Sequence, residues 1–121
     1  MRRDLDLIRK MLLKIEDAPT AWAPEGLSIE GYSPAQVAYH AHLLIEAGFA
    51  EGAVLTYMES EGPEARITNL TWAGHELAEK LRNDTVWHNT MAIVKEKGGA
   101  VTIQILSQLL TVVMKQHFGV P

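Results

Sequence analysis

The segment Ser33–Gly48 constrains the fold most, because residues that begin and end helices stand at its two ends. Ser33 is a residue type that caps helices, and Pro34 follows at the first helical position, where its missing N–H removes no hydrogen bond. Gln36 completes a capping box, and Gly48 suits the left-handed conformation that ends many helices. The pattern therefore predicts a helix over residues 34–47.

The apolar positions of this helix divide it into two faces. The residues expected in the core are Val37, Ala41, Leu44 and Ile45. The residues expected to face solvent are Gln36, Tyr39, His42 and Glu46, with His40 and Leu43 at the margin.

An amphipathic helix is also predicted from Asp4 to about Asp17, where Leu5, Ile8 and Leu12 recur at three-to-four-residue spacing. The basic residues of this region stand mostly off the apolar stripe; they are Arg2, Arg3, Arg9, Lys10 and Lys14. A loop with breaking prolines follows, and residues 27–31 are expected to form a short strand.

Downstream, residues 52–60 and 64–71 favour two strands joined by a turn, which predicts a β-hairpin. Thr71 is expected to cap a helix from Trp72 to about Arg82, in which Gly74 lets the backbone approach a neighbour closely. A further helix is expected to begin at Asn83 or Asp84 and to end at residues 98–99.

The last segment, VTIQILSQLLTVVMKQHF, carries one narrow polar stripe and is apolar over most of the remaining surface. A helix this apolar is buried on more than one side. In a small protein the cover is central packing or a partner chain, and a two-fold dimer is the commonest arrangement. We therefore expect a homodimer through the C-terminal helix.

These elements predict a mainly α fold with a small β-hairpin, in the α+β class. A chain of 121 residues is expected to form one domain, with a core over residues 1–82 and a helical extension over 83–121. No apolar run reaches the roughly 18 residues of a membrane span, and the N-terminus lacks the apolar core of a signal peptide. A cytoplasmic protein without membrane contact is expected.

Charge is unevenly distributed along the chain. All 11 lysines and arginines lie outside residues 15–65, whereas nine of the 15 acidic residues lie within this block. The middle of the chain is therefore acidic and its two ends are basic. A field of this kind influences the choice of partner more than the fold.

The order helix, short strand, helix, hairpin and helix resembles a winged-helix domain. The segments HLLIEAGFAEG (His42–Gly52) and LTWAGHEL (Leu70–Leu77) resemble the elements on either side of the wing in winged-helix transcription regulators. The residues that carry this likeness are Leu43, Leu44, Gly48, Leu70, Thr71 and Gly74. The resemblance implies a winged-helix-like domain with extra C-terminal helices.

A closer resemblance covers most of the chain. The segments RRDLDLIRKMLLKIE, IEGYSPAQVAYHAHLLIEAGF, LTWAGHE and RNDTVWHNT resemble a bacterial and prophage family of small proteins known as a domain of unknown function. This resemblance implies a winged-helix-like fold and a phage or prophage setting. It implies no activity and no site residues.

Conventional DNA reading is poorly supported by charge. Gln36, Tyr39 and His42 could touch bases, but the expected wing carries Glu59, Glu61 and Glu64, which repel phosphates. Phosphates would have to be held by basic residues elsewhere, foremost Arg2, Arg3, Arg9 and Lys10. Basic residues at such positions more commonly form the solvent-exposed face of a helix.

Metal binding and catalysis are not expected. His40 and His42 are two residues apart and point to different faces of a helix, whereas a paired helical site needs a spacing of three or four. The chain has no cysteine, which excludes thiolate chemistry and disulfides. No phosphate-binding glycine loop or nucleophile elbow is present. Neither a cofactor nor a catalytic residue is therefore assigned.

The three tryptophans differ in their surroundings. Trp72 and Trp87 are expected in the core, on the apolar faces of their helices. Trp22 stands in a proline-flanked loop, where either partner recognition or packing over the first helix would account for it.

Two hypotheses follow. The first is a non-enzymatic interaction module that binds a basic protein partner through its acidic helix–wing face and self-associates through its C-terminal helix. The second is a prophage-linked transcription regulator that contacts DNA through Gln36, Tyr39 and His42, with phosphates held by the basic first helix. The acidic wing favours the first.

Overall fold

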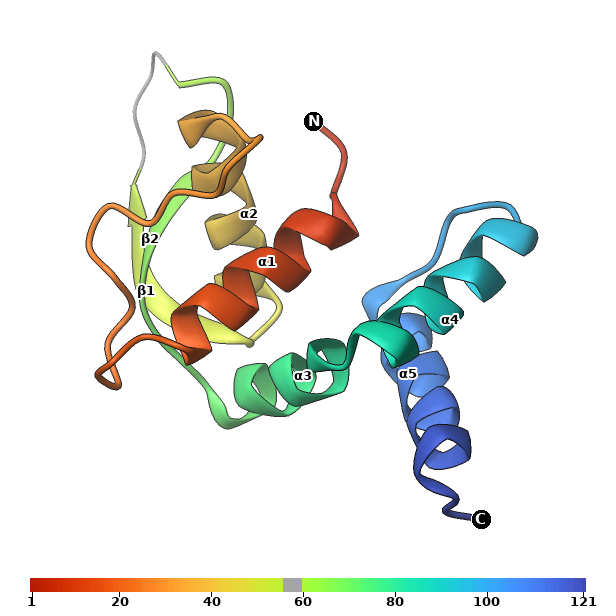
Figure 1. The fold of residues 1–121 in the computed structure, drawn as a ribbon. Helices are drawn as coiled ribbons and strands as arrows, with labels where there is room; N and C mark the ends of the chain where they lie inside the picture. The colour runs from red at the N-terminus through yellow and green to blue at the C-terminus, as the bar shows by residue number, and fades with distance from the viewer. Residues whose placement is uncertain (56–59) are drawn as a thin grey trace. The chain divides into compact units, whose positions relative to one another are not determined.

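The computed structural model describes residues 1–55 and 60–121. In these residues the order of elements is α1 (Leu5–Glu16), α2 (Pro34–Glu46), β1 (Ala50–Leu55), β2 (Glu64–Leu70), α3 (Trp72–Arg82), α4 (Asp84–Glu96) and α5 (Ile103–Phe118) (Figure 1). Of the described residues 56% are helical, and these residues include one antiparallel hairpin, which confirms the mainly α, α+β prediction.

The chain forms two compact units, Met1–Ala78 and Glu79–Pro121. The boundary lies within α3, four residues before the division that the sequence suggests at residue 82.

The predicted signals at the ends of α2 are confirmed, and α1 also begins at a capping residue. The Asp4 side chain accepts a hydrogen bond from the backbone N–H of Leu7 at the start of α1. Ser33 and Gln36 form the reciprocal capping box of α2, in which the Gln36 side chain accepts from the Ser33 N–H at 2.8 Å. Gly48 has the expected positive φ of 84°.

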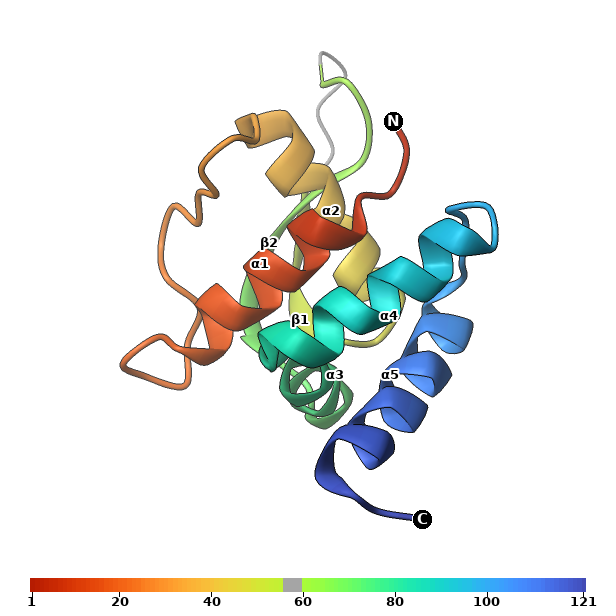
Figure 2. The same cartoon turned by 45° about the vertical axis from the view of Figure 1, so that its right-hand side comes forward.

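The hairpin packs mainly against α2, as Figures 1 and 2 both show. A register shift between Glu51 and Gly52 marks a β-bulge. A side chain at Gly52 would meet the backbone of Arg66, so this bulge requires glycine. The loop before α2 is joined to the hairpin, because the backbone N–H of Ala23 donates to the carbonyl of Thr68 in β2 at 2.8 Å.

The strand predicted at residues 27–31 is wrong. This segment is irregular, although Ile29 is buried in the core. Among the described residues, the sheet consists of β1 and β2 and has no third strand. Residues 27–31 are held instead by the burial of one apolar side chain, which can anchor a loop without a strand partner.

The core of the first unit is formed by apolar faces of its helices and strands. Its buried residues on α1 and α2 include Leu7, Met11, Leu12, Val37, Ala41 and Leu44. The hairpin adds Ala65, Ile67 and Leu70. The predicted core of α2 is therefore confirmed, except that Ile45 is partly exposed.

Trp87, also expected in the core, is only partly buried. Two further predictions of burial are wrong. His40 is 1% exposed instead of marginal, because its two ring nitrogens have backbone partners in the core. Trp72 is 81% exposed instead of buried. The buried residues of α3 include Leu77, which lies five residues further on, so the helical period puts the two side chains on different faces.

The second unit contains a helical hairpin in which α4 packs against α5. Asn83 caps α4 and Thr102 caps α5, each by accepting a backbone N–H. The buried residues of α5 are Leu106, Leu110 and Val113.

Within the part of the chain that the structure describes, no helix combines the length and apolar character needed to cross a bilayer.

Candidate partner-binding site

A small pocket of about 180 Å³ lies between the N-terminal half of α2 and the hairpin segment that leads into β2. Its lining residues are Met1, Ala35, Tyr39, Glu61, Gly62, Pro63 and Glu64. The structure thus brings together three residues that the sequence singled out from two separate elements. Glu59, the third predicted wing carboxylate, lies outside the described residues.

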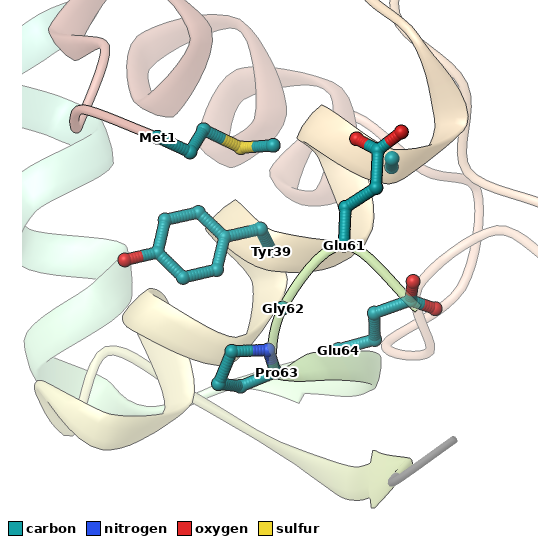
Figure 3. Close-up of a pocket in the computed structure, with 7 residues that line it drawn as sticks. Met1, Tyr39, Glu61, Gly62, Pro63 and Glu64 are labelled. Carbon is teal, nitrogen blue, oxygen red and sulfur yellow. The ribbon is translucent and has the colours of Figure 1, made fainter. Parts of the chain in front are cut away.

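The pocket has an apolar side and a charged side. Figure 3 shows the Tyr39 ring with Met1 and Pro63 on one side, and the Glu61 and Glu64 carboxylates on the other. No ion pair or hydrogen bond joins either carboxylate to another described residue. The pocket therefore offers two carboxylates, without a partner among the described residues, beside an aromatic surface.

Tyr39 is fixed by aromatic neighbours on α2. Its ring stacks on His42 with centroids 6.4 Å apart, and it meets the ring of His40 edge-on at 5.8 Å. His40 is buried, so the Tyr39 ring is in contact with a core side chain. A ring held in this way loses little conformational freedom when a ligand packs on it.

The other two predicted contact residues of α2 are engaged within the helix. The side-chain carbonyl of Gln36 accepts the Ser33 N–H of the capping box. His42 lies 3.1 Å from a Glu46 carboxylate oxygen through Nε2, whereas its buried Nδ1 has no partner among the described residues. Base contacts by these two side chains would have to compete with those interactions.

The basic residues proposed to hold phosphates are spread along α1 and its approach. Arg2 and Arg3 are exposed before the helix, and Arg9 is partly buried. Lys10 forms an ion pair with Asp6 at 2.9 Å and lies over the Tyr32 ring, 5.6 Å from its centroid. These residues do not line the pocket at Tyr39.

The cluster of Asp6, Lys10 and Tyr32 was not expected from the sequence. The Tyr32 hydroxyl donates to Asp6 at 3.1 Å. Burial, this hydrogen bond and the charges of Asp4 and Asp6 raise the pKa of Tyr32 to about 12. Burial alone would raise the pKa of Asp6, but hydrogen bonds from Lys10 and Tyr32 and nearby positive charge lower it overall.

His40 is a structural residue that the sequence did not identify as such. Its Nε2 accepts the backbone N–H of Asp4 at 2.8 Å, and its Nδ1 lies 2.8 Å from the Gln36 carbonyl. This pair of partners requires the neutral tautomer with the proton on Nδ1. His40 thus fastens the start of α1 to the middle of α2. Because the contact with Asp4 spans 36 positions, local sequence pattern could not predict it.

Metal ligands do not gather in the described part of the chain, where no three histidine or carboxylate residues lie close enough to hold an ion. His75 is paired instead with Glu16, 3.1 Å from Nδ1 to the carboxylate.

Comparison with known proteins gives two matches. The profile of the family described as "Hypothetical protein (DUF2513)" matches residues 2–100. An uncharacterised protein of Haemophilus influenzae is 35% identical over 119 residues, covering 96% of this chain and 98% of its own length. No solved structure matches. The chain belongs to the DUF2513 family of hypothetical proteins.

Proposed function

We propose that this protein is a non-enzymatic interaction module that binds a basic segment of a protein partner at the pocket between α2 and the hairpin. It self-associates through α5. The observation that carries the binding proposal is that Tyr39, Glu61 and Glu64 line one pocket, where the two carboxylates have no partner among the described residues.

The pocket suits the side chain of arginine or lysine. Such side chains combine an aliphatic stem with a charged head. The stem would lie along Met1, Tyr39 and Pro63, and the head would reach the two carboxylates. An arginine guanidinium also stacks favourably on an aromatic face, so the Tyr39 ring favours arginine over lysine.

The wider charge of the molecule supports the same partner. Residues 15–65 contain no lysine or arginine, and this block supplies α2 as well as Glu61 and Glu64 of the pocket. A basic partner would be steered towards this region, whereas a phosphate backbone would be repelled. The proposal therefore does not depend on the two carboxylates alone.

The test is an NMR titration of the isotope-labelled chain with N-acetyl-arginine methylamide. We expect the largest shifts at Tyr39, Gly62 and Glu64, and weaker shifts with the lysine analogue. The Glu61→Lys/Glu64→Lys variant should bind at least about tenfold more weakly, since it replaces attraction by repulsion.

The matched control is Glu76→Lys/Glu96→Lys, which makes the same change in net charge at two exposed positions that do not line the pocket. This control should retain the shifts at Gly62. Equal loss in both double variants would mean that overall charge, and not the pocket, attracts the ligand, and the proposed site would be abandoned.

The alternative is a prophage-linked DNA-binding regulator with a winged-helix-like first unit. It is favoured by the order α1, α2, β1, β2 and α3 and by the exposed arginines Arg2 and Arg3. In this alternative α2 contacts the bases through Gln36, Tyr39 and His42. Gln36 and His42 would first have to give up their bonds to Ser33 and Glu46. The phosphates are held from α1.

Fluorescence anisotropy of a mixed-sequence duplex, titrated at about 50 and about 200 mM salt, tests this alternative. Binding that weakens strongly with salt and disappears when Arg2, Arg3, Arg9 and Lys10 are changed to alanine would support the regulator. Affinity that is unaffected by these four changes would refute phosphate binding by α1.

A further inference from the structure

One flank of α5 is not used for packing within the second unit. Ile105 is 47% exposed and Val112 is 52% exposed, and Leu109 between them is partly exposed. Their spacing of four and three residues places them in one row along the helix. We call Ile105, Leu109 and Val112 the α5 stripe.

Two other sides of α5 already have partners. Leu106, Leu110 and Val113 are its buried residues in the pairing with α4. On another side, Ser107 accepts a hydrogen bond from the Lys80 ammonium at 3.0 Å. The stripe is therefore additional to the apolar surface that the second unit uses for its own packing.

The stripe lies in an uncharged region. From Gly98 to Met114 the chain has no aspartate, glutamate, lysine, arginine or histidine, and Lys115 is the first charged residue after it. A heterologous partner selected by charge would find nothing to recognise here. An apolar surface without charge is complementary to itself, which is the requirement of a two-fold contact.

We propose that the α5 stripe pairs with the same stripe of a second copy in an antiparallel, two-fold arrangement. This inference deepens the self-association part of the proposed function and rests on it. The antiparallel orientation follows from Lys115, because a parallel pair would bring the two ammonium groups to the same end of the interface. The helix has a capped start at Thr102 and a left-handed Gly119 at its end, so the pairing element is well defined.

A dimer of this kind would carry two acidic pockets, one on each first unit. A partner with two basic segments could then bind both copies and gain avidity without any new contact. The Haemophilus influenzae relative spans 96% of this chain, so it includes most of the region that corresponds to α5, although the family profile ends at residue 100.

Sedimentation equilibrium of the full chain tests the pairing. The wild-type protein should have about twice the 13.4 kDa mass of one chain, and Val112→Glu should have the mass of one chain. The matched control is Gln104→Glu, which adds the same charge at an exposed polar position of α5 and should remain dimeric. Circular dichroism verifies that both variants are folded.

Cysteine cross-linking gives an independent measurement, because the natural chain has no cysteine. Leu109→Cys should form covalent dimers with a short bifunctional thiol reagent, whereas Gln104→Cys should not. Ile105→Cys reports orientation: parallel helices would bring the two thiols together, and antiparallel helices would separate them by more than about 10 Å along their axes.

A single-chain mass for the wild-type protein at every concentration would overturn the inference, as would dimers that Val112→Glu leaves intact. Efficient cross-linking of Ile105→Cys would overturn the antiparallel arrangement. The arginine titration is independent of these results, since its pocket lies in the first unit and should remain functional in monomeric Val112→Glu.

Discussion

The hydroxyl of Thr71 donates a 2.6 Å hydrogen bond to the carbonyl of Gly48. The same oxygen accepts the Gly74 N–H at 3.1 Å, and the Thr71 N–H donates to the Phe49 carbonyl at 3.1 Å. One residue therefore caps α3 and also joins its start to the turn that follows α2. Two segments that stand 23 positions apart meet at this junction.

Replacing Thr71 by valine removes the hydroxyl while keeping the shape of the side chain. We expect the free energy of unfolding to fall by about 1–2 kcal/mol, because both the cap and the bond to Gly48 are lost. Thr71→Ser keeps the hydroxyl and should lose less than half as much. Urea denaturation followed by circular dichroism measures both, and equal losses would contradict the role of the hydroxyl.

Gly74 is needed for the close approach of α3 to the same turn. A side chain at this position would meet the carbonyl oxygen of Phe49. Gly74→Ala should therefore destabilise the protein by more than about 1 kcal/mol, although alanine normally favours helices. Gly62→Ala is the control, since its added carbon would have ordinary contact with Tyr39. If Gly74→Ala were instead more stable than wild type, the turn at Phe49 would have to shift without cost, and the close approach would not require glycine.

This junction also explains how much of the fold the sequence predicts. Gly48, Thr71 and Gly74 carry part of the winged-helix resemblance, and the structure brings all three to one point. Their roles as helix end, cap and close-approach glycine are local, so sequence patterns could identify each one. The contacts between them are not local, and only the three-dimensional structure reveals them.

The candidate site was predictable in part for the same reason. The acidic block and the position of Tyr39 on α2 are visible in the sequence, and both contribute to the pocket. The irregular path of residues 27–31 and the burial of His40 were not predictable. Both depend on contacts with residues distant in the chain, such as Asp4 for His40 and Lys14 for Ser28. Helical and strand periodicity contain no information about such contacts.

His40 offers a direct test of one such distant contact. His40→Leu keeps an apolar core side chain but leaves the Asp4 N–H without its acceptor. We expect a loss of about 1–3 kcal/mol in the free energy of unfolding. Hydrogen exchange at Leu7 and Ile8 should also accelerate as the start of α1 loosens. The exposed His88 is the control, and His88→Leu should change stability by no more than about 0.5 kcal/mol.

Trp72 differs from His40 because its large side chain lies outside the core. Because it is 81% exposed at the first position of α3, Trp72→Ser should leave the unfolding free energy within about 0.5 kcal/mol of wild type. Thermal and urea denaturation measure the change. A loss comparable to that of a buried tryptophan would mean that this side chain is covered in solution.

Tyr32 makes stability depend on alkaline pH. Its pKa of about 12 lies above the ordinary value of 10.0, so the folded protein holds the phenol proton more tightly than the unfolded chain. The stabilisation is complete below pH 10.0 and is lost as pH rises towards about 12. Tyr32→Phe has no proton to lose and also lacks the hydrogen bond to Asp6. The stability difference between wild type and Tyr32→Phe, measured by urea denaturation, should therefore shrink between about pH 10 and about pH 12. A constant difference would contradict the raised pKa, since the other alkaline groups, Lys10 included, are common to both proteins.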